Sequence, residues 1–91
     1  MTNKKYYVYL LKCNDNSLYC GYTVDLQNRV SAHNNKTGAK YTRSRTPVEL
    51  VYYETFSNKS DALKRECSIK KLTRDKKLLL IKSFEEQIKN S

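Results

Sequence analysis

The sequence predicts a single α+β domain over residues 1–91, a three-stranded antiparallel sheet flanked by helices in the order ββαβαα. Two observations support this class. Two aromatic and β-branched runs are separated by four polar residues, which is typical of a hairpin, and the later apolar spacing changes from strand-like to helical. Because so small a sheet leaves a face open, helices must cover it. A chain of 91 residues has room for one modest core.

The hairpin comes first. The stretch YYVYLLKC (6–13) is predicted to be a strand, NDNS (14–17) a turn, and LYCGY (18–22) the second strand. Gly21 is unusual inside a strand, and it indicates a bulge or the close approach of a backbone or a ligand.

A helix is expected from about residue 25 to 34, with Asp25 near its positive N-terminal end. Residues 34–47 are rich in polar residues and contain Gly38 and Pro47, so we expect a loop there. The run VELVYYETF (48–56) is predicted to be the third strand.

Two further helices are predicted after this strand. Asn58, three residues before Asp61, is an N-cap signal for a helix that extends to about residue 72. Thr73 can cap the last helix, whose apolar face is formed by Leu80, Ile81, Phe84 and Ile88, with Lys77 nearby.

Two of these helices carry ionisable residues on a stripe that a helix normally buries. Arg29 and His33 share one face with Leu26 and Val30, and Glu66 shares one with Ala62 and Ile69. A buried charge needs a partner. One hypothesis is a structural Arg29–Glu66 ion pair; the other is a site in which these side chains and strand tyrosines meet at one face of the sheet.

These residue types suit phosphate chemistry. A carboxylate such as Glu66 can hold a hard divalent cation that keeps several waters, and the guanidinium of Arg29 can neutralise charge that develops on a phosphate. A tyrosine or His33 could then orient or deprotonate water. Because the ordinary pKa of tyrosine is about 10, the tyrosine needs nearby positive charge for that role.

The motifs resemble a known family. YVY (7–9), YCG (19–21) and T-x-D-L-x-x-R-x-x-x-H (23–33) resemble the GIY-YIG endonuclease domain, within it the small standalone bacterial members similar to the nuclease subunit of eukaryotic structure-specific endonucleases. The resemblance continues through AKYTRSR (39–45) and ALKRECSIKKLT (62–73). The chain has YVY in place of GIY and YCG in place of YIG.

The resemblance implies metal-dependent cleavage of a DNA phosphodiester, with Mg²⁺ or Mn²⁺ as the cofactor. It implies that Tyr9 and Tyr19 line the pocket, one of them as a base or water-orienting group. Arg29 matches the catalytic arginine, Glu66 the metal-binding glutamate and His33 a pocket residue. The family's active-site asparagine has no match near Leu78, and Lys71 is a candidate to replace it.

The charge balance favours a polyanionic partner, since Lys and Arg total 18 against 9 Asp and Glu, a net charge of +9. The basic residues gather in two segments, and the residues expected to contact nucleic acid are Lys40, Tyr41, Arg43, Arg45, Lys70 and Lys71. Stacking of an unpaired base on Tyr41 would favour branched or single-stranded DNA over a particular base sequence. Phosphate-led binding alone does not separate DNA from RNA.

Two other functions compete with a nuclease: a non-catalytic nucleic-acid-binding module, and a nuclease subunit whose site a protein partner completes. No apolar run is long enough for a membrane span and the start lacks a secretory signal, so we expect a cytoplasmic protein. Cys13, Cys20 and Cys67 are expected to be small buried hydrophobic residues, with no disulfide framework or zinc site.

Overall fold

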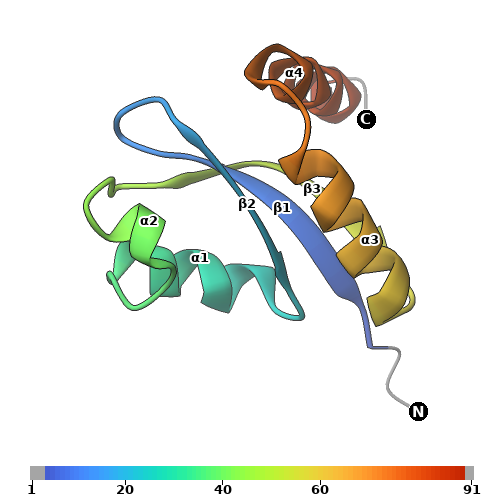
Figure 1. The fold of residues 1–91 in the computed structure, drawn as a ribbon, viewed down its shortest axis with the longest axis horizontal. Helices are drawn as coiled ribbons and strands as arrows, with labels where there is room; N and C mark the ends of the chain where they lie inside the picture. The colour runs from blue at the N-terminus through green and yellow to red at the C-terminus, as the bar shows by residue number, and fades with distance from the viewer. Residues whose placement is uncertain (1–3, 90–91) are drawn as a thin grey trace.

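A three-stranded antiparallel sheet with the strand order β2-β1-β3 forms the centre of the protein (Figure 1). The structure is a computed structural model that describes residues 4–89, except for the side chain of Lys40. Strand β1 is Tyr6–Lys12, β2 is Leu18–Thr23 and β3 is Glu49–Phe56. The predicted α+β class and the hairpin are confirmed. Because β1 is central, β2 and β3 are the two edges of the sheet.

The helices are α1 (Leu26–Asn34), α2 (Lys40–Arg43), α3 (Lys59–Lys70) and α4 (Arg74–Lys89). The predicted caps are confirmed: Asn58 accepts a hydrogen bond from the backbone N–H of Asp61, and Thr73 from that of Lys76. Asp25, expected only near the N-terminal end of α1, also caps its helix by accepting from the N–H of Asn28. Helix α2 was not predicted and interrupts the loop expected at 34–47. It is a single short turn without apolar periodicity, so its sequence has no pattern that predicts a helix.

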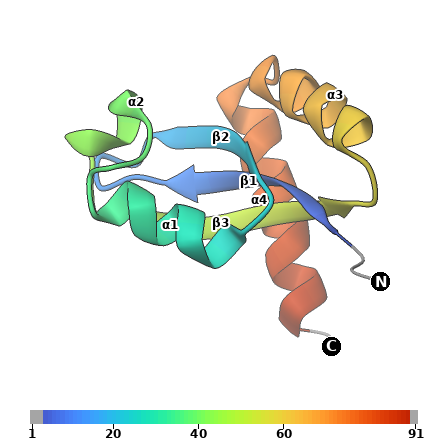
Figure 2. The same ribbon diagram turned by 90° about the horizontal axis from the view of Figure 1, so that it is seen from below.

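Helices cover both faces of the sheet. Figures 1 and 2 show α1 and α2 against one face and α3 and α4 toward the other. Strand alternation divides β1 between these layers, so that Tyr9 and Leu11 belong to the α1 side and Val8 and Leu10 to the α3 side. Leu26 and Val30 pack against the first cluster, while Ala62 and Ile69 are fully buried in the second.

Two expectations about burial need correction. Cys13 and Cys20 are buried as expected, but Cys67 is exposed, because it lies on the side of α3 that faces away from the sheet. Ile81 is the buried residue of α4, whereas Ile88, expected on the same apolar face, is 58% exposed, since it lies beyond the part of the helix that packs on the sheet.

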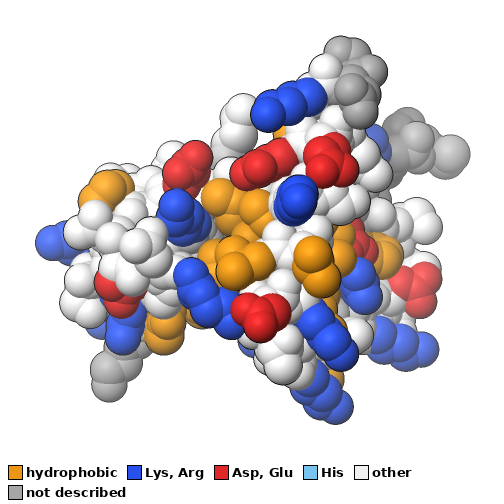
Figure 3. All heavy atoms as spheres, turned by 90° about the horizontal axis from the view of Figure 1, so that it is seen from above, with side chains coloured by type: hydrophobic (Ala, Val, Ile, Leu, Met, Phe, Trp, Pro, Cys, Tyr) orange, Lys and Arg blue, Asp and Glu red, His pale blue; other side chains and the backbone are white. Residues whose placement is uncertain are grey.

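The face that carries α4 mixes both charges with an apolar patch. Figure 3 shows apolar side chains gathered at the middle of this face, with basic and acidic side chains around them.

Among residues 4–89, no helix combines the length and the apolar character needed to cross a bilayer.

Candidate active site

The candidate site is built around Tyr9, which is 1% exposed. Tyr9 lies on β1 directly opposite Gly21 on β2. A Cβ atom added to Gly21 would overlap the Tyr9 hydroxyl and would lie 2.5 Å from its Cζ. Neither of the chain's two glycines, Gly21 and Gly38, has a positive φ. The ring of Tyr9, and not the backbone conformation, therefore excludes a side chain at Gly21. We predicted a bulge or the close approach of a backbone or a ligand at Gly21; the group that approaches it is instead a side chain, the ring of Tyr9.

A chain of hydrogen bonds joins Tyr9 to helix α1 and then to α2. The Tyr9 hydroxyl lies 3.0 Å from Nε2 of His33, and Nε of Arg29 donates to the same hydroxyl over 3.4 Å. On the other side of the imidazole, Nδ1 of His33 lies 2.8 Å from Oγ1 of Thr42. His33 and Thr42 are both fully buried. The ionisable half of the α1 face thus turns inward to meet the tyrosine.

The charges in this cluster follow from burial and from Arg29. Burial raises the pKa of Tyr9, opposed by the hydrogen bond and the charge of Arg29. Burial, and then the charge of Arg29, lower the pKa of His33, so its imidazole is neutral at neutral pH. The hydrogen bond with Tyr9 raises the pKa of Arg29, which remains a cation. The resting cluster therefore holds a protonated tyrosine, a neutral histidine and one positive charge.

Tyr19 closes the cluster toward solvent. Its ring meets His33 edge-on, with ring centroids 5.3 Å apart, and it stacks on Tyr41 at 5.8 Å. The guanidinium of Arg45 lies over the ring of Tyr41, 4.1 Å from the ring centroid, and is itself paired with Asp15. Tyr41 nevertheless remains 39% exposed. A base could stack only on the part of this ring that Tyr19 and Arg45 leave open.

Glu66 reaches the site from the opposite layer of the fold. Helix α3 packs on the other face of the sheet, where the thiol of Cys20 on β2 lies 3.9 Å from the backbone carbonyl of Glu66. The half-buried carboxylate pairs with Lys70 at 3.4 Å, and its charge contributes to the raised pKa of Tyr9. The edge strand β2 thus lies between Glu66 and the site residues of α1. The charge of Glu66 still acts on the pKa of Tyr9 across this strand.

The structural hypothesis of an Arg29–Glu66 ion pair is wrong. Within the described part of the chain, the ion pairs are Arg45–Asp15, Arg65–Glu54 and Lys70–Glu66. Arg29 instead donates to Tyr9. Its guanidinium and the carboxylate of Glu66 remain two separate charged groups on two sides of β2.

The donor set fits one kind of metal ion better than another. Among residues 4–89, no three or more histidine, cysteine or acidic side chains gather in a way that could hold an ion. A zinc site would need such a group. Mg²⁺ commonly binds one or two carboxylates, keeps several waters and takes its other ligands from substrate phosphates. A lone half-buried Glu66 suits that chemistry.

The predicted nucleic-acid contacts border this cluster on two sides. On the α2 side, Arg43 is exposed, Arg45 is half-buried, and the side chain of Lys40 lies outside the described residues. At the C-terminal end of α3, Lys70 and Lys71 are exposed, and Lys70 contacts Glu66. The two basic segments of the sequence therefore lie on either side of the tyrosines and the carboxylate.

Sequence reasoning missed two residues that shape the site, Thr42 and Gly38. Thr42 binds His33, and a Cβ added to Gly38 would lie 2.6 Å from Nδ1 of the same imidazole. The chain has only two glycines, Gly21 and Gly38, and each lies against one member of the Tyr9–His33 pair. The scarcity of glycine in the sequence was the signal that could have pointed to Gly38.

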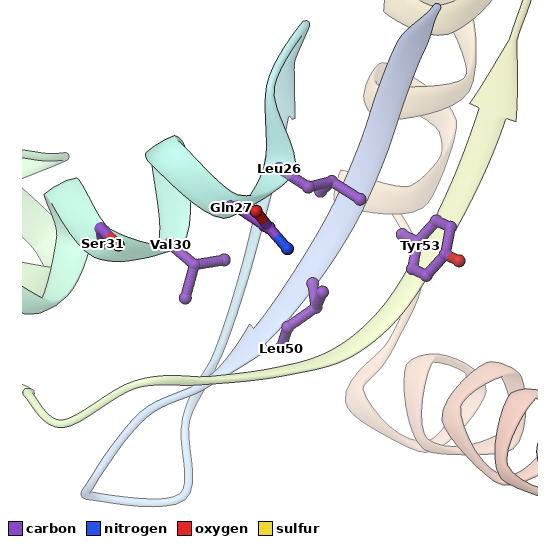
Figure 4. Close-up of a pocket in the computed structure, with 6 residues that line it drawn as sticks. All are labelled: Leu26, Gln27, Val30, Ser31, Leu50 and Tyr53. Atoms are coloured by element: carbon purple, nitrogen blue, oxygen red, sulfur yellow. The ribbon is translucent and has the colours of Figure 1, made fainter.

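A groove of about 580 Å³ lies beside the site, between α1 and β3 (Figure 4). Its lining is largely apolar, from Leu26, Val30, Leu50 and Tyr53, with Gln27 and Ser31 at its side. None of the predicted site residues lines it. A phosphate would find no charged partner among these side chains.

Comparison with known proteins identifies the family of this chain. The family described as the GIY-YIG catalytic domain matches residues 5–79. A UPF0213 protein of Clostridium perfringens is 62% identical over 77 residues, which cover 85% of this chain and 83% of the relative. A UPF0213 protein of Staphylococcus epidermidis is 60% identical over 77 residues, 85% of this chain and 94% of the relative.

Two solution NMR structures share the fold at 44% sequence identity. One, a protein from E. faecalis, has a TM-score of 0.61 and covers 93% of this chain and 92% of its own. The other, a UPF0213 protein from Bacillus halodurans, has a TM-score of 0.57 and covers 86% and 83%. With the matched residues 5–79 spanning most of its length, this chain belongs to the GIY-YIG catalytic domain family, a nuclease family.

Proposed function

We propose that this protein is a metal-dependent endonuclease that hydrolyses DNA phosphodiester bonds. The observation that carries the proposal is the Arg29–Tyr9–His33 hydrogen-bond chain, in which Tyr9 and His33 are buried and Arg29 is half-buried, with Tyr19 beside it and the Glu66 carboxylate across β2. A half-buried cation and a buried neutral imidazole on one hydroxyl are more than packing requires, since apolar residues would fill the same space at lower cost.

Arg29 and the tyrosines supply the charge and proton chemistry. In the proposed reaction, water attacks phosphorus, a new P–O bond forms and the P–O bond to the leaving oxygen breaks. The leaving oxygen keeps the electron pair of the broken bond and takes a proton from solvent water. The attacking water gives its proton to the Tyr9 oxygen as the Tyr9 proton passes to Nε2 of His33, 3.0 Å away. The remaining N–H groups of Arg29 stabilise the negative charge that develops on the phosphate oxygens.

Glu66 is the residue that would hold the divalent cation. When bound, Mg²⁺ or Mn²⁺ would act as a Lewis acid on the phosphate and neutralise part of its charge. Lys70 contacts the same carboxylate at 3.4 Å and is exposed enough to turn away toward a phosphate. The positive charge of Lys70 would then bind a phosphate of the DNA backbone.

The substrate is proposed to be DNA recognised by its shape. Arg43, Lys70 and Lys71 are exposed cations on both sides of the cluster, and such contacts neutralise phosphates without reading bases. Tyr41 already contacts Tyr19 and Arg45, which argues against base stacking as the first contact. We therefore expect branched or nicked DNA to be selected by the path of its backbone.

The test is a cleavage assay on labelled branched, nicked and linear DNA, with Mg²⁺ or Mn²⁺ and then with chelator. Wild-type protein should give chelator-sensitive products. Arg29→Ala and Glu66→Ala should each lose about 10²–10³-fold in rate, the scale for removing one electrostatic stabiliser of a transition state, while DNA binding is largely kept. Failure to observe any chelator-sensitive product with any of these DNAs would contradict the proposal.

Matched controls separate chemistry from folding and contamination. Tyr53→Phe removes a hydroxyl from a strand tyrosine that is 39% exposed and outside the site, so it should cleave like wild type. Tyr9→Phe removes the hydroxyl that joins Arg29 to His33 and should lose about 10²-fold or more. A contaminating nuclease would cleave equally in all preparations. Binding that survives every change with no cleavage would favour a non-catalytic module.

A further inference from the structure

His33 can take the Tyr9 proton only in one of its two neutral forms. Nε2 must be unprotonated, so the imidazole proton must be on Nδ1. In water, neutral imidazole side chains favour the opposite form, with the proton on Nε2. In a protein, the form is set by the hydrogen bond that the other ring nitrogen makes. Something in the fold must therefore hold the proton on Nδ1.

The hydroxyl of Thr42 has the position for this task. Its Oγ1 lies 2.8 Å from Nδ1 of His33 and donates its own proton to the backbone carbonyl of Ala39 over 2.9 Å. A threonine hydroxyl has a single proton. With that proton directed at Ala39, Oγ1 is left to accept from His33, and this arrangement favours the hydrogen on Nδ1.

The backbone around Thr42 is built to keep this arrangement. The N–H of Thr42 also donates to the Ala39 carbonyl, over 3.1 Å, which fixes the acceptor next to the hydroxyl. Gly38 lets the chain pass close to Nδ1, where any side chain would collide with the imidazole. Thr42 is fully buried, so water does not compete for its hydroxyl.

We propose that Thr42 is a positioning residue that sets the tautomer of His33 and so makes Nε2 the acceptor of the Tyr9 proton. The catalytic consequence rests on the proposed nuclease function, whereas the tautomer itself does not. The three hydrogen bonds then all donate in one direction along the chain: Arg29 donates to the Tyr9 oxygen, Tyr9 to Nε2 of His33, and Nδ1 of His33 to Thr42. Thr42 touches no substrate and acts through His33.

The tautomer can be measured directly because His33 is the chain's single histidine. Long-range ¹H–¹⁵N correlation spectra of the imidazole near pH 8 distinguish a protonated from an unprotonated ring nitrogen. Wild-type protein should show the proton on Nδ1. Thr42→Val keeps the shape of threonine but removes the hydroxyl, so it should move population to the Nε2-protonated form. Thr42→Ser keeps the hydroxyl and should retain the wild-type spectrum.

Cleavage rates measured across pH form the second readout. Thr42→Val should lose about 10–100-fold, taking as a guide the loss seen when the hydrogen-bond partner of a metal-bound histidine is removed, with a displaced pH profile. Thr42→Ser should restore both the rate and the profile. A purely structural threonine would change the melting temperature and leave the pH profile in place.

The outcomes are distinguishable. A wild-type proton on Nε2, or a Thr42→Val spectrum identical to wild type, overturns the inference, and the wild-type spectrum decides alone if Thr42→Val does not fold. If the spectra agree with the inference but wild-type protein never cleaves, the tautomer assignment stands and the nuclease proposal fails.

Discussion

Replacing Gly21 with alanine tests the site with a single methyl group. An added Cβ would lie 2.5 Å from Cζ of Tyr9, whereas ordinary contacts begin at 3.4 Å, so the ring has to move by about 0.9 Å. A displacement of about 1 Å at reacting groups can cost about 10²-fold in rate. We therefore expect Gly21→Ala to cleave DNA about 10²-fold more slowly than wild type.

The same change should lower stability only moderately. Overpacking a core costs about 1–3 kcal/mol, partly offset by about 0.4–1 kcal/mol because alanine reduces the freedom of the unfolded chain. For a domain of this size, each kcal/mol corresponds to about 4–8 °C in melting temperature. Below its melting transition the variant should therefore be folded and slow.

The assay compares cleavage rates and thermal melts of Gly21→Ala and Cys20→Ala. Cys20 is the buried neighbour on the opposite face of β2, so its truncation should lower stability without moving Tyr9. If Gly21→Ala cleaves at the wild-type rate, or if Cys20→Ala slows cleavage equally, then the placement of the Tyr9 hydroxyl does not control the chemistry and the argument fails.

Three further predictions follow from the same structure. Because the folded-state pKa of His33 is lowered from 6.5, its contribution to stability is present above that pH and is lost as the pH falls through the lowered value; melts from pH 8 to 5 should therefore fall more steeply for wild type than for His33→Asn. Tyr52→Phe should reduce stability by about 1 kcal/mol with unchanged cleavage, since the Tyr52 hydroxyl donates to Glu54, which Arg65 also binds, on the face of the sheet opposite Tyr9. Lys71→Ala should weaken binding to all DNA sequences alike and reduce the slope of log affinity against log salt by about 1, measured by fluorescence anisotropy at several salt concentrations.

Local chemistry made much of the fold predictable. Asn58 and Thr73 cap α3 and α4 as expected, because a cap needs only a side chain three residues from a free N–H. The four polar residues after β1 mark the hairpin for a similar reason. Helix α2 was missed because four residues show no helical period, and its role depends on contacts with His33 that are distant in sequence.

The site was predictable in its residue types and less so in its connections. The apolar stripe of α1 indicated that Arg29 and His33 turn inward, and they do. The stripe of α3 placed Glu66 inward too, but it could not indicate that α3 covers the opposite face of the sheet from α1. Thr42 was missed because threonine is usually exposed, and because its hydrogen bond with His33 joins residues nine positions apart in the sequence.

The division of the site between two layers bears on how the protein becomes active during synthesis. The hairpin, α1 and α2 contain the residues of the proposed proton relay, and α3 carries the proposed metal carboxylate. Because chains emerge N-terminus first, the residues of the relay are synthesised before Glu66. A nascent or truncated chain would then hold a proton relay but no means to bind the cation. Nuclease activity would arise only when the last third of the chain docks, so incomplete molecules would be harmless to the DNA around them.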